Sequence, residues 1–159
     1  MTEEDRLFTH QHLNQREAAI FFTLPEFEQK HGVAVARKML EEAAGIRSID
    51  QKKLVRLGLL HDVGKSAARL TILDKGLLVS LRRFAAPVYN YLAEQGRGDK
   101  AFRYFRKFFV HKHHGEVGAE LLAKIGESRD IIEEIKRHDK PYAEHDVYLR
   151  LLDLVDSTL

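Results

Sequence analysis

The sequence predicts a single all-α domain. Apolar residues recur at intervals of three and four along most of the 159 residues, which is the spacing of one face of a helix. Clean runs with the alternation of a half-buried strand are absent, and β-branched residues are scattered. No internal repeat, low-complexity segment or long linker interrupts the chain, whose length suits one domain with its own core.

The first two helices are expected to form an N-terminal extension. Thr2 is a suitable N-cap for a helix that starts with three acidic residues, which favour the positive end of the helix dipole. Asn14 would cap the second helix in the same way. Residues 1–24 are therefore predicted to be a helical extension, and residues 25–159 to be the main body of the domain.

The next two helices have recognisable starts and ends. Pro25 would occupy the first position of the third helix and Gly45 would end it, since proline and glycine are favoured at these positions. Asp50 would cap the fourth helix, which is strongly apolar. Gly64 is expected to end this fourth helix, with Lys65 directly after it.

The second half of the chain continues the helical pattern. Residues 72–95 are predicted to form two helices with a break at Pro87, because proline disrupts a helix interior. A basic and aromatic segment follows at residues 100–112. The remaining predicted helices span residues 114–126, 128–140 and 144–159.

The composition excludes several kinds of chemistry. The chain has no cysteine, so disulfides, thiolate metal sites and cysteine nucleophiles are all ruled out. Any metal must be held by His, Asp and Glu, which favours Mn, Fe, Co, Ni, Mg or a cysteine-free Zn site. The formal charge of +2 does not by itself indicate nucleic-acid binding. The acidic N-terminus is unlike a signal peptide and no apolar stretch could span a membrane, so a cytoplasmic protein is expected.

Several predicted helices carry a histidine or an aspartate on the face that should point inward. His61 lies one turn after Leu57, and Asp62 follows an apolar line on the same helix. Four other helices show the same arrangement, with His31, His114, His138 and Asp156. Each residue alone is more commonly a core or cap residue, but their coincidence favours a shared metal site, because buried polar groups need partners. His111 and His113 are expected at the surface, unless one of them enters the site.

This order of residues resembles the HD superfamily of metal-dependent phosphohydrolases. The resemblance is carried by His31 in QKHGVAVARKM, His61-Asp62 in LLHDVGK, His114 in HGEVGAELL, His138 in IKRHDKP and Asp156 in LLDLVDS. It covers the chain from about residue 25 to the end and implies an HD-type helical bundle with a metal site in its core. The paired histidine and the Gly-Tyr-Pro element of the cyclic-dinucleotide branch are missing, so small stand-alone bacterial HD proteins are the closer match.

The resemblance also implies one or two divalent metal ions. The first ion would be held by His31, His61, Asp62 and Asp156. Asp62 would bridge to a second ion held by His114 and His138. Asp153, one turn before Asp156, is either a residue that orients a ligand, the last ligand itself, or a surface acid.

The activity implied by this resemblance is hydrolysis of a phosphate ester, in particular a nucleotide or a related small phosphorylated molecule. A metal ion lowers the pKa of a bound water and so supplies hydroxide at neutral pH. Asp62 and Lys65 are the predicted catalytic residues, with Lys65 contacting a phosphate oxygen as a point charge. The alternative for Lys65 is an exposed lysine after a C-cap glycine. Arg103 and Arg106 are predicted to bind substrate together with Lys65.

Residues 97–114 interleave six Lys or Arg with five aromatic residues. Three interpretations remain open: an amphipathic helix with its rings in the core, a channel for a phosphate-rich substrate, or contact with RNA or an anionic membrane. Helical spacing puts Phe102, Phe105 and Phe109 on one face. This spacing favours the first interpretation, with a basic rim available to a nucleotide.

Two other function classes remain open. The first is a catalytically idle HD-fold domain that senses a ligand or partner, although six converging ligands are more than a scaffold needs. The second is a nucleic-acid-binding helical protein that uses residues 97–114, with salt-dependent binding that survives the loss of His61 and Asp62. The sequence does not indicate the oligomeric state.

Overall fold

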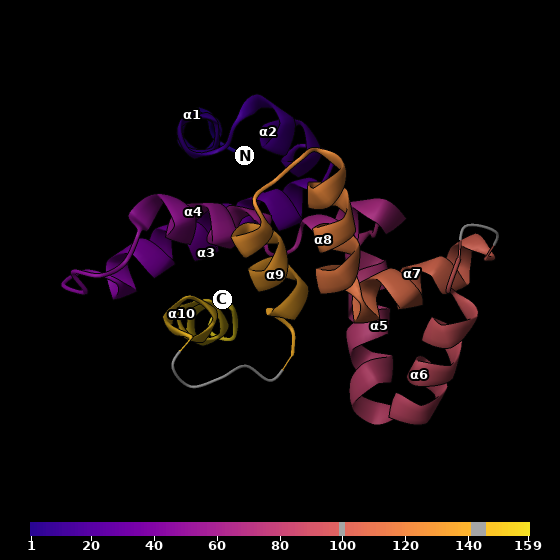
Figure 1. The fold of residues 1–159 in the computed structure, drawn as a ribbon. Helices are drawn as coiled ribbons and strands as arrows, with labels where there is room; N and C mark the ends of the chain where they lie inside the picture. The colour runs from indigo at the N-terminus through magenta and orange to yellow at the C-terminus, as the bar shows by residue number, and fades with distance from the viewer. Residues whose placement is uncertain (99–100, 141–145) are drawn as a thin grey trace.

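The computed structural model describes residues 1–98, 101–140 and 146–159, and within these ranges every regular element is a helix (Figure 1). The predicted all-α fold is therefore confirmed. A short 3₁₀-helix, η1, spans Val63–Ala68. The α-helices are α1 (Glu3–His12), α2 (Gln15–Phe21), α3 (Glu26–Glu42), α4 (Gln51–Leu60), α5 (Ile72–Phe84), α6 (Ala86–Gln95), α7 (Arg103–Lys112), α8 (His114–Lys124), α9 (Arg129–Arg137) and α10 (Val147–Asp156).

The predicted N-caps are present. Thr2 accepts a hydrogen bond from the backbone N–H of Asp5 at 3.1 Å and so caps α1. Asn14 and Asp50 cap α2 and α4 by the same kind of bond. Pro25 is the N-cap of α3 rather than its first helical residue, so the helix begins one residue later than predicted. It ends at Glu42 rather than near Gly45.

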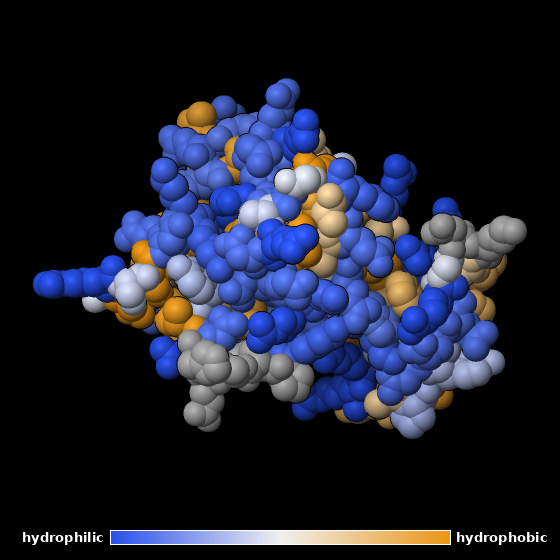
Figure 2. All heavy atoms as spheres, in the orientation of Figure 1, coloured by the Kyte–Doolittle hydropathy of each residue, from blue (hydrophilic) through white to orange (hydrophobic). Residues whose placement is uncertain are grey.

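The main core lies between α2, α3, α4, η1, α8 and α9. Phe21, Leu57, Leu59, Leu122 and Ile135 are among its fully buried side chains. The extension of helices α1 and α2 packs on this same core rather than apart from it (Figure 1). The face over α8 and α9 is mostly hydrophilic (Figure 2), and no helix among the described residues is long and apolar enough to cross a membrane.

Helices α5, α6 and α7 form a lobe at one side of the molecule (Figure 1). The lobe has its own small cluster of buried residues, which includes Leu78, Tyr89 and Phe108. The prediction that Phe102, Phe105 and Phe109 share a face packed in the core is only partly right, because Phe105 and Phe109 are half-buried whereas Phe102 is 70% exposed. The buried ring of this segment is Phe108. Within the segment 97–114, residues 99–100 lie outside the described part of the chain.

The end of α4 differs from the prediction. The helix stops at Leu60 with His61 as its C-cap, and Gly64 lies inside η1 instead of ending α4. A glycine is needed there because η1 presses against the start of α8. A Cβ atom added to Gly64 would lie 2.0 Å from the carbonyl oxygen of His114 and 2.6 Å from the amide nitrogen of Gly118. This contact brings the residues that follow α4 next to those that begin α8.

Candidate metal centre

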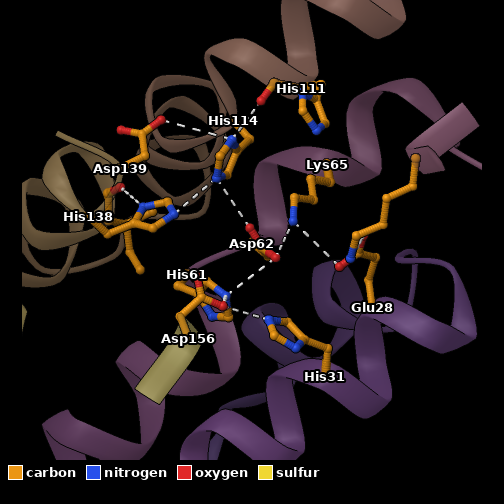
Figure 3. A network of polar contacts seen from close by, with 12 residues as sticks. Glu28, His31, His61, Asp62, Lys65, His111, His114, His138, Asp139 and Asp156 are labelled. Atoms are coloured by element: carbon orange, nitrogen blue, oxygen red, sulfur yellow. Dashed lines mark hydrogen bonds and ion pairs between the residues drawn. The ribbon is translucent and has the colours of Figure 1, made fainter. Parts of the chain in front are cut away.

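The six predicted ligands lie together in two groups of three (Figure 3). The first group contains His31, His61 and Asp156, and the second contains Asp62, His114 and His138. Within each group the candidate ligand atoms all lie within 4.8 Å of one another. We call these groups the first triad and the second triad.

Helix ends deliver five of the six side chains to the site. His61 and His138 are the C-caps of α4 and α9, His114 is the first residue of α8, and Asp156 is the last residue of α10. Asp62 follows His61 directly, as the residue before η1. The sixth side chain, His31, comes from the interior of α3. The site therefore depends on the packing of five helices and could not form from any one segment.

Three of the histidines are oriented by backbone carbonyls. The Nδ1 atom of His61 lies 2.9 Å from the carbonyl oxygen of Gly58, three residues earlier. His114 and His138 make the same contact, at 3.0 Å and 2.6 Å, also with the residue three positions earlier. A carbonyl can only accept, so Nδ1 of each ring carries a proton and Nε2 is the nitrogen that remains for a metal. All three rings therefore turn a metal-binding atom toward the site.

Asp62 links the two triads through its two carboxylate oxygens. Its Oδ2 lies 3.3 Å from the Nε2 of His61, whereas its Oδ1 lies 3.3 Å from the Nε2 of His114. The side chain is almost completely buried. A carboxylate in this position can bridge two cations, one on each side.

A charged network extends from Asp62 toward the lobe. The Lys65 ammonium is paired with Asp62 and lies 3.5 Å from Glu28. Glu28, whose side chain is fully buried, also pairs with Lys75 of α5 at 3.1 Å. The alternative that Lys65 is an exposed lysine is wrong, because its side chain is only 12% exposed and its ammonium faces the site (Figure 3).

The polar atoms of the site are incompletely satisfied without a cation. The Nε2 atoms of His114 and His138 face each other at 3.1 Å, and both are lone-pair acceptors when Nδ1 donates to a carbonyl. A proton between them would need a buried imidazolium, which is costly. The buried Nε2 of His61 likewise has no hydrogen-bond partner among the described residues. A divalent cation in each triad would satisfy these atoms, so the residues present fit a metal.

The shifted pKa values of the site histidines are consistent with a metal ion in each triad. Burial lowers the pKa of His114 to about 3 and also lowers the pKa of His138, so both rings are neutral ligands at neutral pH. Burial would lower the pKa of His61 as well, but the negative charges of Asp62 and Asp156 outweigh it and raise that pKa to about 10. A proton on His61 thus compensates for two carboxylates, and a metal ion would take its place.

A cavity of about 320 Å³ opens next to the second triad. His114 and Asp139 line one part of it, and residues of the lobe and of the end of α7 line the rest: Arg82, Ala86, Tyr89, Asn90 and Lys112. The sequence did not point to the lobe residues as part of the site, since they belong to no motif. Only the packing of the lobe against α8 brings them there.

His111 is buried rather than at the surface, so the expectation for this residue is wrong. Its Nδ1 lies 2.7 Å from the hydroxyl oxygen of Tyr89. Burial raises the pKa of Tyr89 to about 12 and lowers the pKa of His111 to about 4, so a neutral phenol donates to a neutral imidazole. This bond ties α6 to α7 beside the site.

Two other predicted positions lie away from the triads. Arg103 and Arg106 line a separate basic hollow with Lys107 and the end of η1, and none of the six candidate ligands lines it. Asp153 belongs to neither triad, whereas Asp156 is 2.7 Å from His31. Substrate binding by the two arginines thus remains a prediction, and Asp156 is the better candidate for the last ligand.

The fold and the site together define a class of protein: an all-helical protein in which helix ends assemble two adjacent His/Asp groups that could hold divalent cations. The chain belongs to the HD-domain family, whose family model, described as HD domain, matches residues 29–159. Members of this family are typically metal-dependent phosphohydrolases. Comparisons with curated proteins and with solved structures found no match.

Proposed function

We propose that this protein is a metal-dependent phosphohydrolase that acts on a small phosphorylated molecule such as a nucleotide, using two divalent ions. The observation that carries the proposal is the position of Asp62 between the histidines of the two triads. One of its carboxylate oxygens faces His61 of the first triad, and the other faces His114 of the second. Two cations bridged in this way can hold the attacking and the leaving oxygen of a phosphoryl transfer.

The ligands have distinct tasks in this reaction. His31, His61 and Asp156 would hold one ion, and His114 and His138 would hold the other, with Asp62 shared between them. The bound ions would lower the pKa of a water molecule and offset charge on the phosphoryl oxygens. Hydrolysis then forms a bond between the water oxygen and phosphorus and breaks the ester P–O bond. The leaving oxygen ends as a hydroxyl group.

Lys65 contributes a positive charge at the centre of the site. In the structure its ammonium is paired with Asp62, the carboxylate that would bridge the two ions, and lies 3.5 Å from Glu28. An incoming phosphate would add a further negative group near this cation. Lys65 would therefore position Asp62 in the free protein and stabilise the phosphoryl group when substrate is bound.

The test is metal content measured together with hydrolysis. Wild type, Asp62→Ala and the control Asp130→Ala would be purified without chelator, and their metal content would be determined by inductively coupled plasma mass spectrometry. Asp130 is a suitable control because its side chain is 58% exposed and it pairs with Lys53, which is not a candidate ligand. Activity would be measured with p-nitrophenyl phosphate and bis(p-nitrophenyl) phosphate after addition of Mn²⁺.

We expect close to two ions per chain and measurable hydrolysis in wild type and in the control. Asp62→Ala should lose most of the metal and the activity. Less than about a tenth of an ion per wild-type chain, with no gain on adding Mn²⁺, would refute the proposal. Bound metal without hydrolysis of either ester would favour the catalytically idle domain instead.

A further inference from the structure

We infer that the cavity beside the second triad binds a second anionic group of the substrate, and that Arg82 is the residue that recognises it. The substrate class would then be phosphate esters whose leaving group carries another phosphate or a carboxylate. This inference rests on the proposed function, because it places the leaving group in the cavity while the reacting phosphate lies at the triads.

The position of the cavity supports this assignment. His114 of the second triad lines it, so a molecule bound in the cavity lies directly beside the candidate metal site. Its volume of about 320 Å³ is at the lower end for small-molecule sites and suits a small leaving group, such as a nucleoside that carries one phosphate. A phosphate held at the triads could thus extend its ester group into this space.

The charges of the lining favour an anion. Lys112 is already paired with Glu94 at 3.2 Å, so its charge is partly compensated. No carboxylate among the described residues forms an ion pair with Arg82, which extends from α5 into the lining and is exposed. Among the described residues that line the cavity, Asp139 is the one carboxylate, and it lies beside His114. The part of the lining that the lobe contributes is therefore positive, and the guanidinium of Arg82 suits bidentate binding of a phosphate or carboxylate.

The neutral residues of the lining are consistent with a sugar or a base between the two anionic groups. The hydroxyl of Tyr89 is engaged by His111, so this residue is held in place. Asn90 adds an amide group that can both donate and accept hydrogen bonds. Together they offer a surface for a polar, uncharged linker between the reacting phosphate at the triads and the second anion at Arg82.

The experiment compares substrates that differ by one anionic group. The probes are adenosine 5′-monophosphate, adenosine 3′,5′-bisphosphate and p-nitrophenyl phosphate, assayed with the metal-loaded protein. The variants are Arg82→Ala and the matched control Arg83→Ala, the next residue of α5, which is also exposed but does not line the cavity. Metal content is measured for each variant, so that a damaged metal site is detected separately.

Wild type should prefer the bisphosphate over the monophosphate by at least 10-fold in kcat/KM. Arg82→Ala should remove this preference mainly through KM and should affect p-nitrophenyl phosphate, which lacks the second anion, far less than the bisphosphate, while Arg83→Ala should behave like wild type. Equal effects of Arg82→Ala on all three probes, or none, would overturn the inference.

A separate binding measurement distinguishes failure of the inference from failure of the proposed function. If wild type hydrolyses none of the probes, calorimetric titration of the metal-loaded protein with the bisphosphate still tests the anion site. Binding that weakens at least 10-fold in Arg82→Ala and not in Arg83→Ala would support the site without the reaction. Absence of binding, or identical binding by both variants, would refute it.

Discussion

Replacing Gly64 with alanine should separate η1 from α8 and damage the second triad. The new Cβ would lie 2.0 Å from the carbonyl oxygen of His114, and a carbon needs at least about 3 Å from such an atom, so the two segments must move apart by about 1 Å. Both groups in the contact are backbone, so no flexible side chain can yield. The cost should reach the upper part of the overpacking range, about 3 kcal/mol.

The same movement should affect metal binding. Asp62, two residues before Gly64, is 3.3 Å from the Nε2 of His114, and a site of this kind tolerates displacements of only about 0.5 Å. We therefore expect Gly64→Ala to bind its second metal ion at least about 10-fold more weakly. The first triad, which contains no residue of α8, should keep its ion.

The assay is urea unfolding combined with metal titration, with Gly76→Ala as the matched control. Gly76 lies inside α5 with nothing within 4 Å of an added Cβ, so this change should stabilise the protein by about 0.5–1 kcal/mol. If Gly64→Ala were as stable as the control and kept both ions, the close contact between η1 and α8 would not be holding the second triad together.

Three further predictions concern separate parts of the structure. Arg56→Ala should lower the free energy of unfolding by about 3 kcal/mol in urea titrations, since it leaves the buried carboxylates of Glu17 and Glu127 without their cation; an unchanged midpoint would contradict this. His138→Ala should retain about one metal ion per chain by mass spectrometry, because the first triad does not use this residue, and retention of two ions would be inconsistent with the assignment. Burial lowers the pKa of His111 from 6.5 to about 4, so the metal-free folded protein binds fewer protons there. The contribution of His111 to stability should be full above about pH 6.5 and should be lost as the pH falls toward 4, so His111→Gln should show a smaller fall in urea midpoint over that range than wild type.

The local features of the fold could be predicted from the sequence because their causes are local. The sequence predicts N-caps at Thr2, Asn14 and Asp50 from the residue type and from its position directly before a helical pattern, and each forms the expected bond. The predicted helix end at Gly64 is wrong, because a glycine after an apolar helix usually ends that helix but this one lies inside η1. Its actual requirement is a contact with a segment fifty residues later, which no local pattern contains.

The candidate ligands could be predicted from the sequence, whereas the residues that line the cavity could not. The six His and Asp positions lie on apolar helix faces within a family motif, and the structure brings all six into two groups, although metal binding by them remains a prediction. Arg82 and Tyr89 have no such pattern, because they reach the site only through the packing of the lobe. His111 was expected at the surface since its sequence neighbours are basic, but its burial depends on Tyr89, which is on another helix.

The carbonyl contacts of His61, His114 and His138 have a consequence for how the protein tolerates mutation. In each case the acceptor is the main chain three residues earlier, which is present whatever side chain stands at that position. A change of side chain at Ile135 therefore leaves the acceptor for His138 in place, provided that the helix end keeps its shape. Gly58 is the exception among the acceptors, because a Cβ atom there would lie 2.6 Å from the Cα of Ala36 and would displace the backbone itself. Random variation should inactivate this site by displacing backbone or by replacing a ligand, and seldom by removing a supporting side chain.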